Sequence, residues 1–377
     1  MKLASVAEPP MPYGRICVSA TDRYPPAPSY HDALYRVSLG MSIHAGALSR
    51  AVRELLAAEA TDTRDRYLVG LLTGLMARGP IKDEVIEVLD AALSLDRRPP
   101  VQRHDLHGRR LLVLAGSGKK GVKSVNVTTP AAIVATAAGA DVVKMGSTAT
   151  SSVLGSRDLA RRIGLPECRT AAAALDSVRR CGFAFVPIEE MIPTLDAAYG
   201  GRFHVVNPFS FGLAGLVSPV HGDVLVYGLA HPGVDLAARV LARFGKPRAV
   251  VVGSFTSEGY ASDEYGLGTH SVACEVNGGV AGTVTTMTTD ELRAFGLGDP
   301  AAFRAPRSPD EAIQWVTDAL AGRGNPAHLA AIAINAALFL RSADVVADIA
   351  AGYGLAMSTI HSGRANAKLA QICQVMP

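Results

Sequence analysis

Between Leu111 and Gly164, short apolar runs alternate with loops rich in glycine and hydroxyl side chains. The apolar run Leu111–Leu114 leads into a glycine-rich loop, and a second apolar run ends at Lys144. Apolar runs that alternate with helix-like segments are typical of a parallel sheet covered by helices. Ligands of such sheets bind where the strands end. Because a glycine loop exposes backbone N–H groups and Lys144 adds positive charge, this stretch predicts a phosphate-binding site.

Two nucleotide-binding motifs lie close to this loop in sequence, but neither fits its context. Gly116–Gly121 matches the GxGxxG pattern of dinucleotide-binding folds, and its end is one inserted residue away from a P-loop. Such a motif requires a helix that opens inside the glycine loop. Here Val122–Val127 is rich in β-branched residues, and the better helix start follows, where Thr128 or Thr129 can cap and Pro130 takes the first helical position. We therefore do not expect a nicotinamide cofactor.

The rest of the chain divides by composition and periodicity. Residues 1–29 contain six prolines and predict an irregular arm, whereas residues 30–100 repeat apolar side chains at helical spacing. Residues 105–377 return to alternating strand-like and helix-like segments. The predicted fold is therefore α/β with a small all-α domain, that is, a mostly parallel sheet flanked by helices plus an N-terminal helical bundle. We expect part of residues 185–200 to join the helical domain.

Composition excludes few classes of protein. A net charge of +3 argues against a strongly basic nucleic-acid-binding protein, although it leaves room for a local basic groove. The N-terminus lacks an apolar signal core, and the other apolar runs are interrupted by charge, so we expect a soluble protein without a membrane partner. The cysteines show no metal-binding spacing, and reduced thiols in a cytoplasm are the simplest interpretation: Cys17, Cys168, Cys181, Cys274 and Cys373.

Several motifs, in order and with matching gaps, resemble those of the anthranilate phosphoribosyltransferase family and the related pyrimidine nucleoside phosphorylases. The family's GTGGDG loop resembles Gly116–Gly121, its NIST motif resembles Asn126–Thr129, and its KHGNRxVSS motif resembles Lys144–Ser152. Ser156 and Asp158 follow at the family spacing. The resemblance covers nearly everything after about residue 30. It implies a phosphoribosyltransferase that binds 5-phosphoribosyl 1-diphosphate (PRPP) in the α/β domain, with a small helical domain that forms a homodimer contact and one wall of the cleft.

The resemblance also implies a set of substrate-binding residues. Glycines at 116 and 118 would leave space that a Cβ would otherwise fill, and hydroxyl groups would donate hydrogen bonds to phosphate. The expected set is Gly116, Ser117, Gly118, Lys119, Lys120, Ser124, Asn126, Thr128, Thr129, Lys144, Met145, Gly146, Ser147, Ser151, Ser152 and Ser156.

A second part of the site is implied far along the chain, at Asp263 and Glu264. Two adjacent carboxylates alone usually form a solvated turn, but the pair resembles the family's Asp-Glu that binds magnesium on the diphosphate. Magnesium prefers oxygen ligands and commonly joins carboxylates to substrate phosphates. The resemblance thus implies Mg²⁺ held by Thr128, Asp263 and Glu264, with Lys144, Asp263 and Glu264 as the catalytic residues.

The chain also departs from the family pattern. Lys120 replaces the loop aspartate, and Met145 and Ser147 replace the histidine and asparagine of KHGN. The arginine that binds the carboxylate of anthranilate has no clear counterpart, because Arg202 matches a later arginine. Since a buried carboxylate without a charged partner is costly, we expect an acceptor other than anthranilate. The apolar side chains of Met145, Phe209 and Phe211 favour a flat acceptor, either nucleobase-like or another aromatic amine.

Two alternatives remain open. A nucleoside phosphorylase would share the fold, although the retained carboxylate pair favours a diphosphate over free phosphate. A non-catalytic relative that binds nucleic acid through a basic groove would use Lys119, Lys120 and Lys123, and we consider nucleic acid an unlikely partner. Steep loss of single-stranded DNA binding with rising salt would identify this second alternative.

Overall fold

The computed structural model describes residues 28–121, 126–149, 153–299, 301, 303 and 305–375. Almost all of the predicted N-terminal arm lies outside these residues. So do Ser124, Ser151 and Ser152, which the resemblance implies as substrate-binding residues, and Lys123, which belongs to the nucleic-acid-binding alternative. No helix in the described part of the chain is long and apolar enough to cross a membrane.

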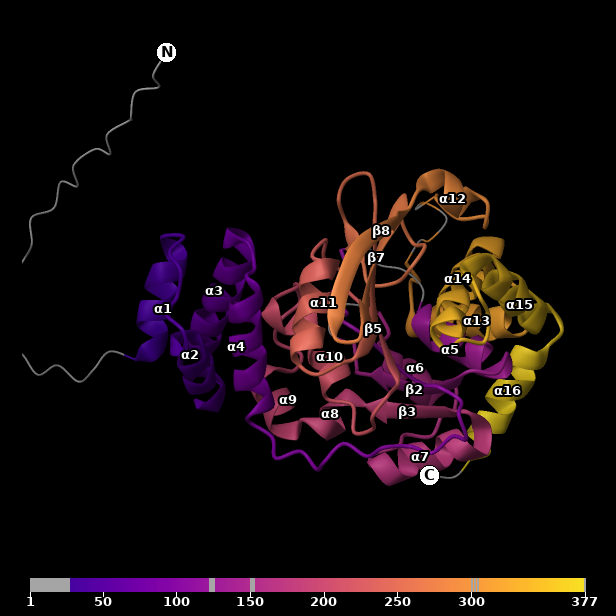
Figure 1. The fold of residues 1–377 in the computed structure, drawn as a ribbon, viewed down its shortest axis with the longest axis horizontal. Coiled ribbons are helices and arrows are strands. Elements are labelled where there is room, and N and C mark those ends of the chain that lie inside the picture. The colour runs from indigo at the N-terminus through magenta and orange to yellow at the C-terminus, as the bar shows by residue number, and fades with distance from the viewer. Residues whose placement is uncertain are drawn as a thin grey trace, which may run out of the picture.

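Four helices open the described chain and lie together at one end of the molecule (Figure 1). They are α1 (Ser29–Ser38), α2 (Ala47–Ala57), α3 (Asp62–Arg78) and α4 (Lys82–Leu93). Most of their leucines and valines face inward, among them Leu55, Leu68 and Leu89, each at most 1% exposed. Gly79, at a φ of 101°, separates α3 from α4 just before Pro80. This all-α part of the predicted fold is therefore confirmed, whereas its boundaries as a separate domain stay a prediction.

The remaining chain builds one sheet with the order β3-β2-β1-β4-β5-β7-β8, and β6 pairs with β5. Strands β1 to β5 run parallel, and β6 to β8 are antiparallel. The predicted, mostly parallel sheet is thus confirmed. The bounds are β1 Leu111–Gly116, β2 Asp141–Gly146, β3 Phe183–Pro187, β4 Val224–Gly228, β5 Arg248–Phe255, β6 Ala261–Ser262, β7 His270–Asn277 and β8 Val280–Met287.

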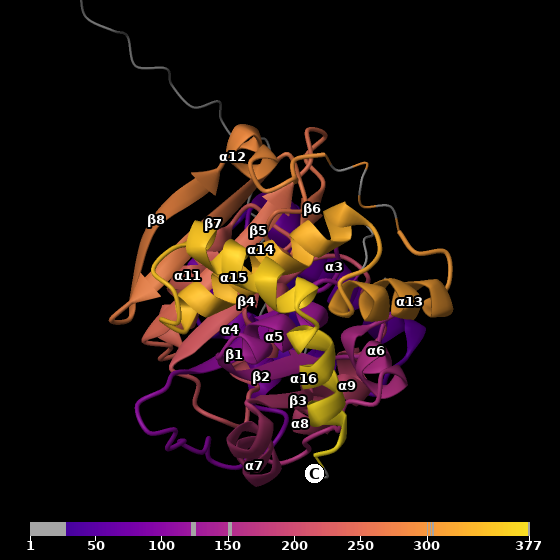
Figure 2. The same cartoon turned by 90° about the vertical axis from the view of Figure 1, so that its right-hand side faces the viewer.

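Helices cover both faces of the sheet (Figures 1 and 2). Alternate residues of β1 show the division, because Leu112 and Leu114 pack into a core with α5 and α14, while Val113 packs with α10 and α11. This alternation follows from the two-residue period of a strand. The helices of this part are α5 Thr128–Ala137, α6 Ser156–Arg162, α7 Ala171–Cys181, α8 Ile188–Met191, α9 Pro193–Tyr199, α10 Leu213–Leu216, α11 Val234–Arg243, α12 Thr289–Arg293, α13 Pro309–Leu320, α14 Pro326–Ser342, α15 Ile349–His361 and α16 Arg364–Cys373, with the 3-10 helix η1 Pro208–Phe211.

Two helix starts differ from the sequence prediction. Helix α5 begins at Thr128, so Pro130 is its third residue and neither threonine side chain caps it. A proline is tolerated there because the first four helical N–H groups have no intrahelical partner. Helix α6 includes Ser156, although the sequence predicts a helix that starts at Arg157 with Ser156 as its cap. The carboxylate of Asp158 instead accepts hydrogen bonds from the N–H groups of Gly155 and Ala149 at 3.0 and 2.8 Å.

Candidate active site

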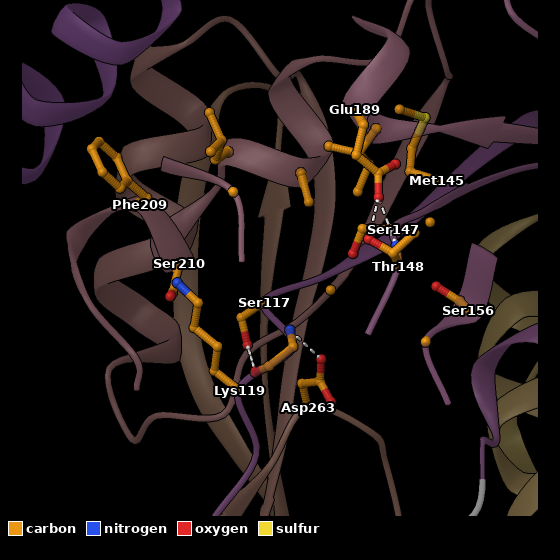
Figure 3. Close-up of a pocket in the computed structure, with 18 of the residues that line it drawn as sticks. Ser117, Lys119, Met145, Ser147, Thr148, Ser156, Glu189, Phe209, Ser210 and Asp263 are labelled. Atoms are coloured by element: carbon orange, nitrogen blue, oxygen red, sulfur yellow. Dashed lines mark hydrogen bonds between the residues drawn. The ribbon is translucent and has the colours of Figure 1, made fainter. Parts of the chain in front are cut away.

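A cavity of about 250 Å³ opens at the carboxyl ends of β1, β2 and β4 (Figure 3). Opposite the strand ends it is walled by α8, α9 and η1. The glycine loop and the Asp263–Glu264 pair, more than a hundred residues apart in sequence, both line it. The predicted site residues that line it are Gly116, Ser117, Gly118, Lys119, Lys120, Asn126, Thr128, Lys144, Met145, Gly146, Ser147, Ser156, Asp263 and Glu264.

The predicted substrate-binding residue Thr129 lies outside this lining. Thr129 is fully buried, and its hydroxyl has no hydrogen-bond partner among the described residues. Its neighbour Thr128 does face the cavity. Successive residues of a helix point in different directions, so only one of the two threonines can face the cavity.

The glycine loop is held by backbone contacts to two other segments. The N–H of Ser117 donates to the carbonyl of Gly228 at 2.8 Å, at the end of β4. The N–H of Gly118 donates to Asp263 Oδ2 at 2.8 Å, and the N–H of Gly121 donates to the carbonyl of Ala261 at 2.9 Å. Gly118 has a φ of +60°, a conformation that favours glycine. The loop therefore has a defined shape without any ligand.

Close approach explains two of the glycines. A Cβ at Gly116 would lie 2.8 Å from Asp263 Oδ2, and a Cβ at Gly228 would lie 1.9 Å from the carbonyl oxygen of Asp263. At Gly118, by contrast, a Cβ would meet nothing within 4 Å. Space for a Cβ is therefore open at Gly118, whereas the close approach of Asp263 explains the glycine at Gly116.

The segment that carries the two carboxylates is fixed from behind by α14. Asn335 of this helix donates to the carbonyl of Tyr265 at 2.7 Å and accepts from its N–H at 3.1 Å. The hydroxyl of Ser254 donates to the carbonyl of Glu264 at 2.6 Å. Both contacts are buried, so strand β5 and helix α14 determine where the carboxylates point.

Lys120 lies between the two carboxylates. Its Nζ is hydrogen-bonded to Glu264 Oε1 and lies 3.4 Å from Asp263 Oδ1. Burial alone would lower the pKa of Lys120, but the two carboxylates outweigh burial and raise it. Burial raises the pKa of Glu264, although Lys120 opposes that effect. The sequence predicts Lys120 as a phosphate ligand, and in the structure its ammonium offsets one of the two negative charges of the carboxylate pair.

The other two lysines of the cavity have no carboxylate within ion-pair distance in the part of the chain that the structure describes. Lys144, inside β2, is 4% exposed and donates to the carbonyl of Met145 at 2.5 Å. Burial lowers its pKa to about 8, partly offset by Asp263 and Glu264. Lys119 is hydrogen-bonded to the hydroxyl of Tyr199, and burial lowers its pKa to about 7. Both cations are therefore available to an incoming anion.

The residues predicted to hold magnesium can be tested against this geometry. Carboxylate and hydroxyl oxygens are ligands that Mg²⁺ accepts, and Asp263 Oδ1 is buried without a hydrogen-bond partner. Thr128 lines the same cavity. However, the point between Asp263 and Glu264 is already taken by the ammonium of Lys120. The donor set thus fits one cation, and a lysine occupies that position.

An aromatic wall faces the glycine loop, and Phe209 is the one member of it that the sequence predicts. The Tyr199 ring stacks on Phe203 with centroids 4.9 Å apart and meets Phe209 edge-on at 4.6 Å. Lys119 extends from the loop toward Ser210 and Phe209 in Figure 3, and its Nζ lies 4.6 Å from the centre of the Tyr199 ring. Phe209 and Met145 line the cavity as predicted. Phe211 does not, because it is fully buried against His231.

The loop after β2 is positioned by a buried arginine. Glu189 accepts from the N–H and the hydroxyl of Thr148 at 2.6 and 3.0 Å (Figure 3). Arg157 lies 3.3 Å from Glu189 and also contacts Glu190 at 2.7 Å. A bidentate pair of 2.7 and 2.9 Å joins Arg157 to Glu167. Hydrogen bonding to Arg157 lowers the pKa of Glu167 to about 2.

Replacing Arg157 with methionine is expected to lower the free energy of unfolding by about 3–5 kcal/mol, because three carboxylates lose a buried partner. Since the folded pKa of Glu167 is depressed, its contribution is present above about pH 4.5 and lost as the pH falls toward about 2. The variant should show a weaker acid dependence, of which Arg161 maintains the rest through its own contact with Glu167. Urea unfolding between pH 7 and pH 3 measures both effects. Arg161→Met is the matched control, because Arg161 contacts the same Glu167 from an exposed position and should cost about 1 kcal/mol or less.

Comparisons with known proteins agree with this architecture. The family described as "Glycosyl transferase family, a/b domain" matches residues 110–366. The anthranilate phosphoribosyltransferase of Shewanella sp. (strain W3-18-1) is 32% identical over 323 residues, covering 82% of this chain and 87% of the relative. That of Pseudoalteromonas translucida is 29% identical over 314 residues, covering 82% of this chain and 84% of the relative.

Solved structures show the same fold. Anthranilate phosphoribosyltransferase from Thermus thermophilus superposes with a TM-score of 0.70 at 27% identity, covering 91% of this chain and 98% of that one. The Saccharomyces cerevisiae enzyme in complex with PRPP and Mg superposes with a TM-score of 0.71 at 19% identity, covering 91% and 96%. The predicted phosphoribosyltransferase-type enzyme is thereby confirmed, and the chain belongs to the glycosyl transferase family that includes the anthranilate phosphoribosyltransferases.

Proposed function

We propose that the chain transfers the 5-phosphoribosyl group of PRPP to a flat aromatic or nucleobase-like acceptor other than anthranilate and releases pyrophosphate. The observation that supports this most is a single cavity with two unlike halves. One half holds a glycine loop, buried lysines and a carboxylate pair, and the other is an aromatic wall. A charged sugar diphosphate and a flat ring are substrates that match the two halves.

The diphosphate of PRPP would bind at the carboxyl ends of the strands. Backbone N–H groups of the glycine loop and the ammonium of Lys144 can hold phosphate oxygens. We propose Mg²⁺ as the cofactor that arrives with the diphosphate. Asp263, Glu264 and Thr128 are the oxygen ligands that this chain would offer it, once the ammonium of Lys120 gives up its place between the two carboxylates. When bound, the metal would neutralise charge on the departing pyrophosphate.

In the reaction, the bond between the anomeric carbon and the diphosphate oxygen breaks, and the acceptor forms a new bond to that carbon. Negative charge grows on the leaving group, where Lys144 and the loop N–H groups stabilise it. The aromatic wall holds the acceptor opposite the leaving group, so positioning supplies much of the rate.

The acceptor preference rests on which cations face the cavity. Among the described lining residues the positive side chains are Lys119, Lys120 and Lys144, and none is an arginine. Arg202 pairs with Asp65 at 3.0 Å outside the cavity. A planar carboxylate therefore finds no bidentate guanidinium partner, which favours an acceptor without that group.

The test measures the release of pyrophosphate from PRPP, with Mg²⁺ present, for each member of a panel of heteroaromatic compounds. Anthranilate is the comparison. We expect at least one compound to outperform anthranilate. A higher kcat/KM with anthranilate than with every other compound would contradict the acceptor proposal. Phosphate-dependent cleavage of a nucleoside, without PRPP turnover, would instead indicate the phosphorylase alternative.

We further propose a cytoplasmic homodimer formed through the helical domain. Tyr35 and Leu39 in and after α1 are 65% and 56% exposed, and Val69 of α3 is 40% exposed, so these helices present apolar area to a second copy. The cysteines Cys168, Cys181 and Cys274 are buried free thiols, which suits a reducing compartment.

The pKa of Lys119 predicts how PRPP binding depends on pH. In the substrate-free chain its pKa is about 7, and a phosphate nearby would raise that value. PRPP binding should therefore take up a proton, be strongest below about pH 7 and weaken as the pH rises through that value. Calorimetry in buffers of different ionisation enthalpy measures the uptake. In Lys119→Arg, whose side chain stays charged, the uptake near pH 7 should fall, and the remaining uptake would come from Lys144, whose pKa is about 8. Unchanged uptake would exclude Lys119 as a source.

A further inference from the structure

The carboxylate pair of the active site is already neutralised in part by the chain itself. The ammonium of Lys120 contacts Glu264 Oε1 and lies 3.4 Å from Asp263 Oδ1. The Lys120 side chain is 20% exposed, and those of Asp263 and Glu264 are 9% and 4% exposed. Two negative charges and one positive charge leave one negative charge in excess, in a place that water hardly reaches.

The two carboxylates are anchored on the sides that face away from Lys120. Asp263 Oδ2 accepts from the N–H of Gly118 at 2.8 Å, and Glu264 Oε2 accepts from the hydroxyl of Ser262 at 2.9 Å. The remaining oxygens, Asp263 Oδ1 and Glu264 Oε1, both face the ammonium. These two oxygens therefore lie on either side of a position that suits one small cation.

We propose that the ammonium of Lys120 takes this position in place of a divalent metal ion, so that the substrate-free chain binds no metal between Asp263 and Glu264. An ammonium donates hydrogen bonds and repels a second cation, so lysine and metal compete for the same two oxygens. The lysine also joins the glycine loop to the carboxylate segment, so that the loop is shaped without metal. A further consequence, which rests on the proposed function, is that PRPP binds without added metal.

Binding of Mn²⁺ alone to the substrate-free protein tests the proposal, with electron paramagnetic resonance to count bound ions. The wild type should show no site that depends on Glu264. Lys120→Met removes the charge but keeps most of the stem, and it should gain a site of at least about tenfold higher affinity. Lys120→Arg should remain without it, because it keeps the charge, and Lys120→Met with Glu264→Gln should lose the gained site. The gained site should also raise the melting temperature of Lys120→Met when Mg²⁺ is added.

Two results would overturn the proposal. One is Mn²⁺ binding by the wild type that Glu264→Gln removes, a measurement that needs no lysine variant to fold. The other is a folded Lys120→Met protein that binds Mn²⁺ no better than the wild type.

A separate titration with PRPP, in the presence of excess chelator, shows whether the proposal about Lys120 or the proposed function has failed. The wild type should bind PRPP there, and Lys120→Met should need added Mg²⁺. A wild type that binds PRPP only with Mg²⁺ would overturn the metal-free consequence alone. If PRPP binds to no form under any condition while the Mn²⁺ results hold, the proposed function fails and the assignment of Lys120 stands.

Discussion

Replacing Asp263 with asparagine and Glu264 with glutamine is expected to lower kcat for pyrophosphate release by about a thousandfold. The change keeps the side-chain shapes but removes both negative charges. Lys120 then lies buried without its ion partners. Asp263 Oδ2 also aligns the N–H of Gly118, and an amide nitrogen in that place would repel it. Steady-state kinetics with saturating PRPP and Mg²⁺ measure the effect.

A matched control uses another adjacent acidic pair. Asp290 and Glu291 lie at the exposed start of α12, and Asp290→Asn with Glu291→Gln changes the same charges on the surface. The control should retain nearly full kcat. Equal loss in both double variants would show that overall charge, and not the carboxylates of the cavity, explains the effect.

Gly228→Ala is expected to abolish transfer although no new charge or polar group is introduced. A Cβ at this position would lie 1.9 Å from the carbonyl oxygen of Asp263, so β4 and the carboxylate segment must separate. The shift would also disturb Ser117, whose N–H donates to the carbonyl of Gly228 at 2.8 Å. We expect a loss of about 1–3 kcal/mol in the free energy of unfolding and a much larger relative loss of kcat/KM.

Gly354→Ala serves as the control for this glycine. Gly354 lies inside α15, and a Cβ there would meet nothing within 4 Å. Alanine is the better helix former, so this variant should be more stable by up to about 1 kcal/mol, with unchanged activity. Urea unfolding and kinetics on both variants separate local crowding at the site from a general effect of replacing glycine. A fully active Gly228→Ala protein would contradict the close packing around Asp263.

The strand–loop–helix arrangement could be predicted from sequence because its signals are local. Apolar runs, glycines and Pro130 follow each other within a short stretch, and parallel strands bring their carboxyl ends to one edge. The position of Asp263 at that edge of the sheet could not be predicted in the same way. It depends on contacts such as Asn335 with Tyr265, which no local pattern reveals. Only the family resemblance implied it.

Three further features of the site could not be predicted from the sequence, each for a physical reason. A lysine in a glycine loop is typical of a phosphate ligand, but the sequence does not show that two carboxylates lie within reach of Lys120. Tyr199 and Phe203 lie on either side of a Gly-Gly turn, where aromatic side chains carry no periodic signal, so the sequence does not predict these two members of the aromatic wall. Phe209 and Phe211 are two residues apart in η1, and the sequence could not tell which of them faces the cavity.

The central claim is that the glycine loop and the Asp263–Glu264 segment form one pocket for PRPP. Titration of the wild type with PRPP and Mg²⁺ in a calorimeter tests it most directly. We predict saturable binding of one PRPP per chain, which is at least about tenfold weaker in the Asp263→Asn, Glu264→Gln variant. Absence of binding to the folded wild type, or equal binding to the variant, would contradict it.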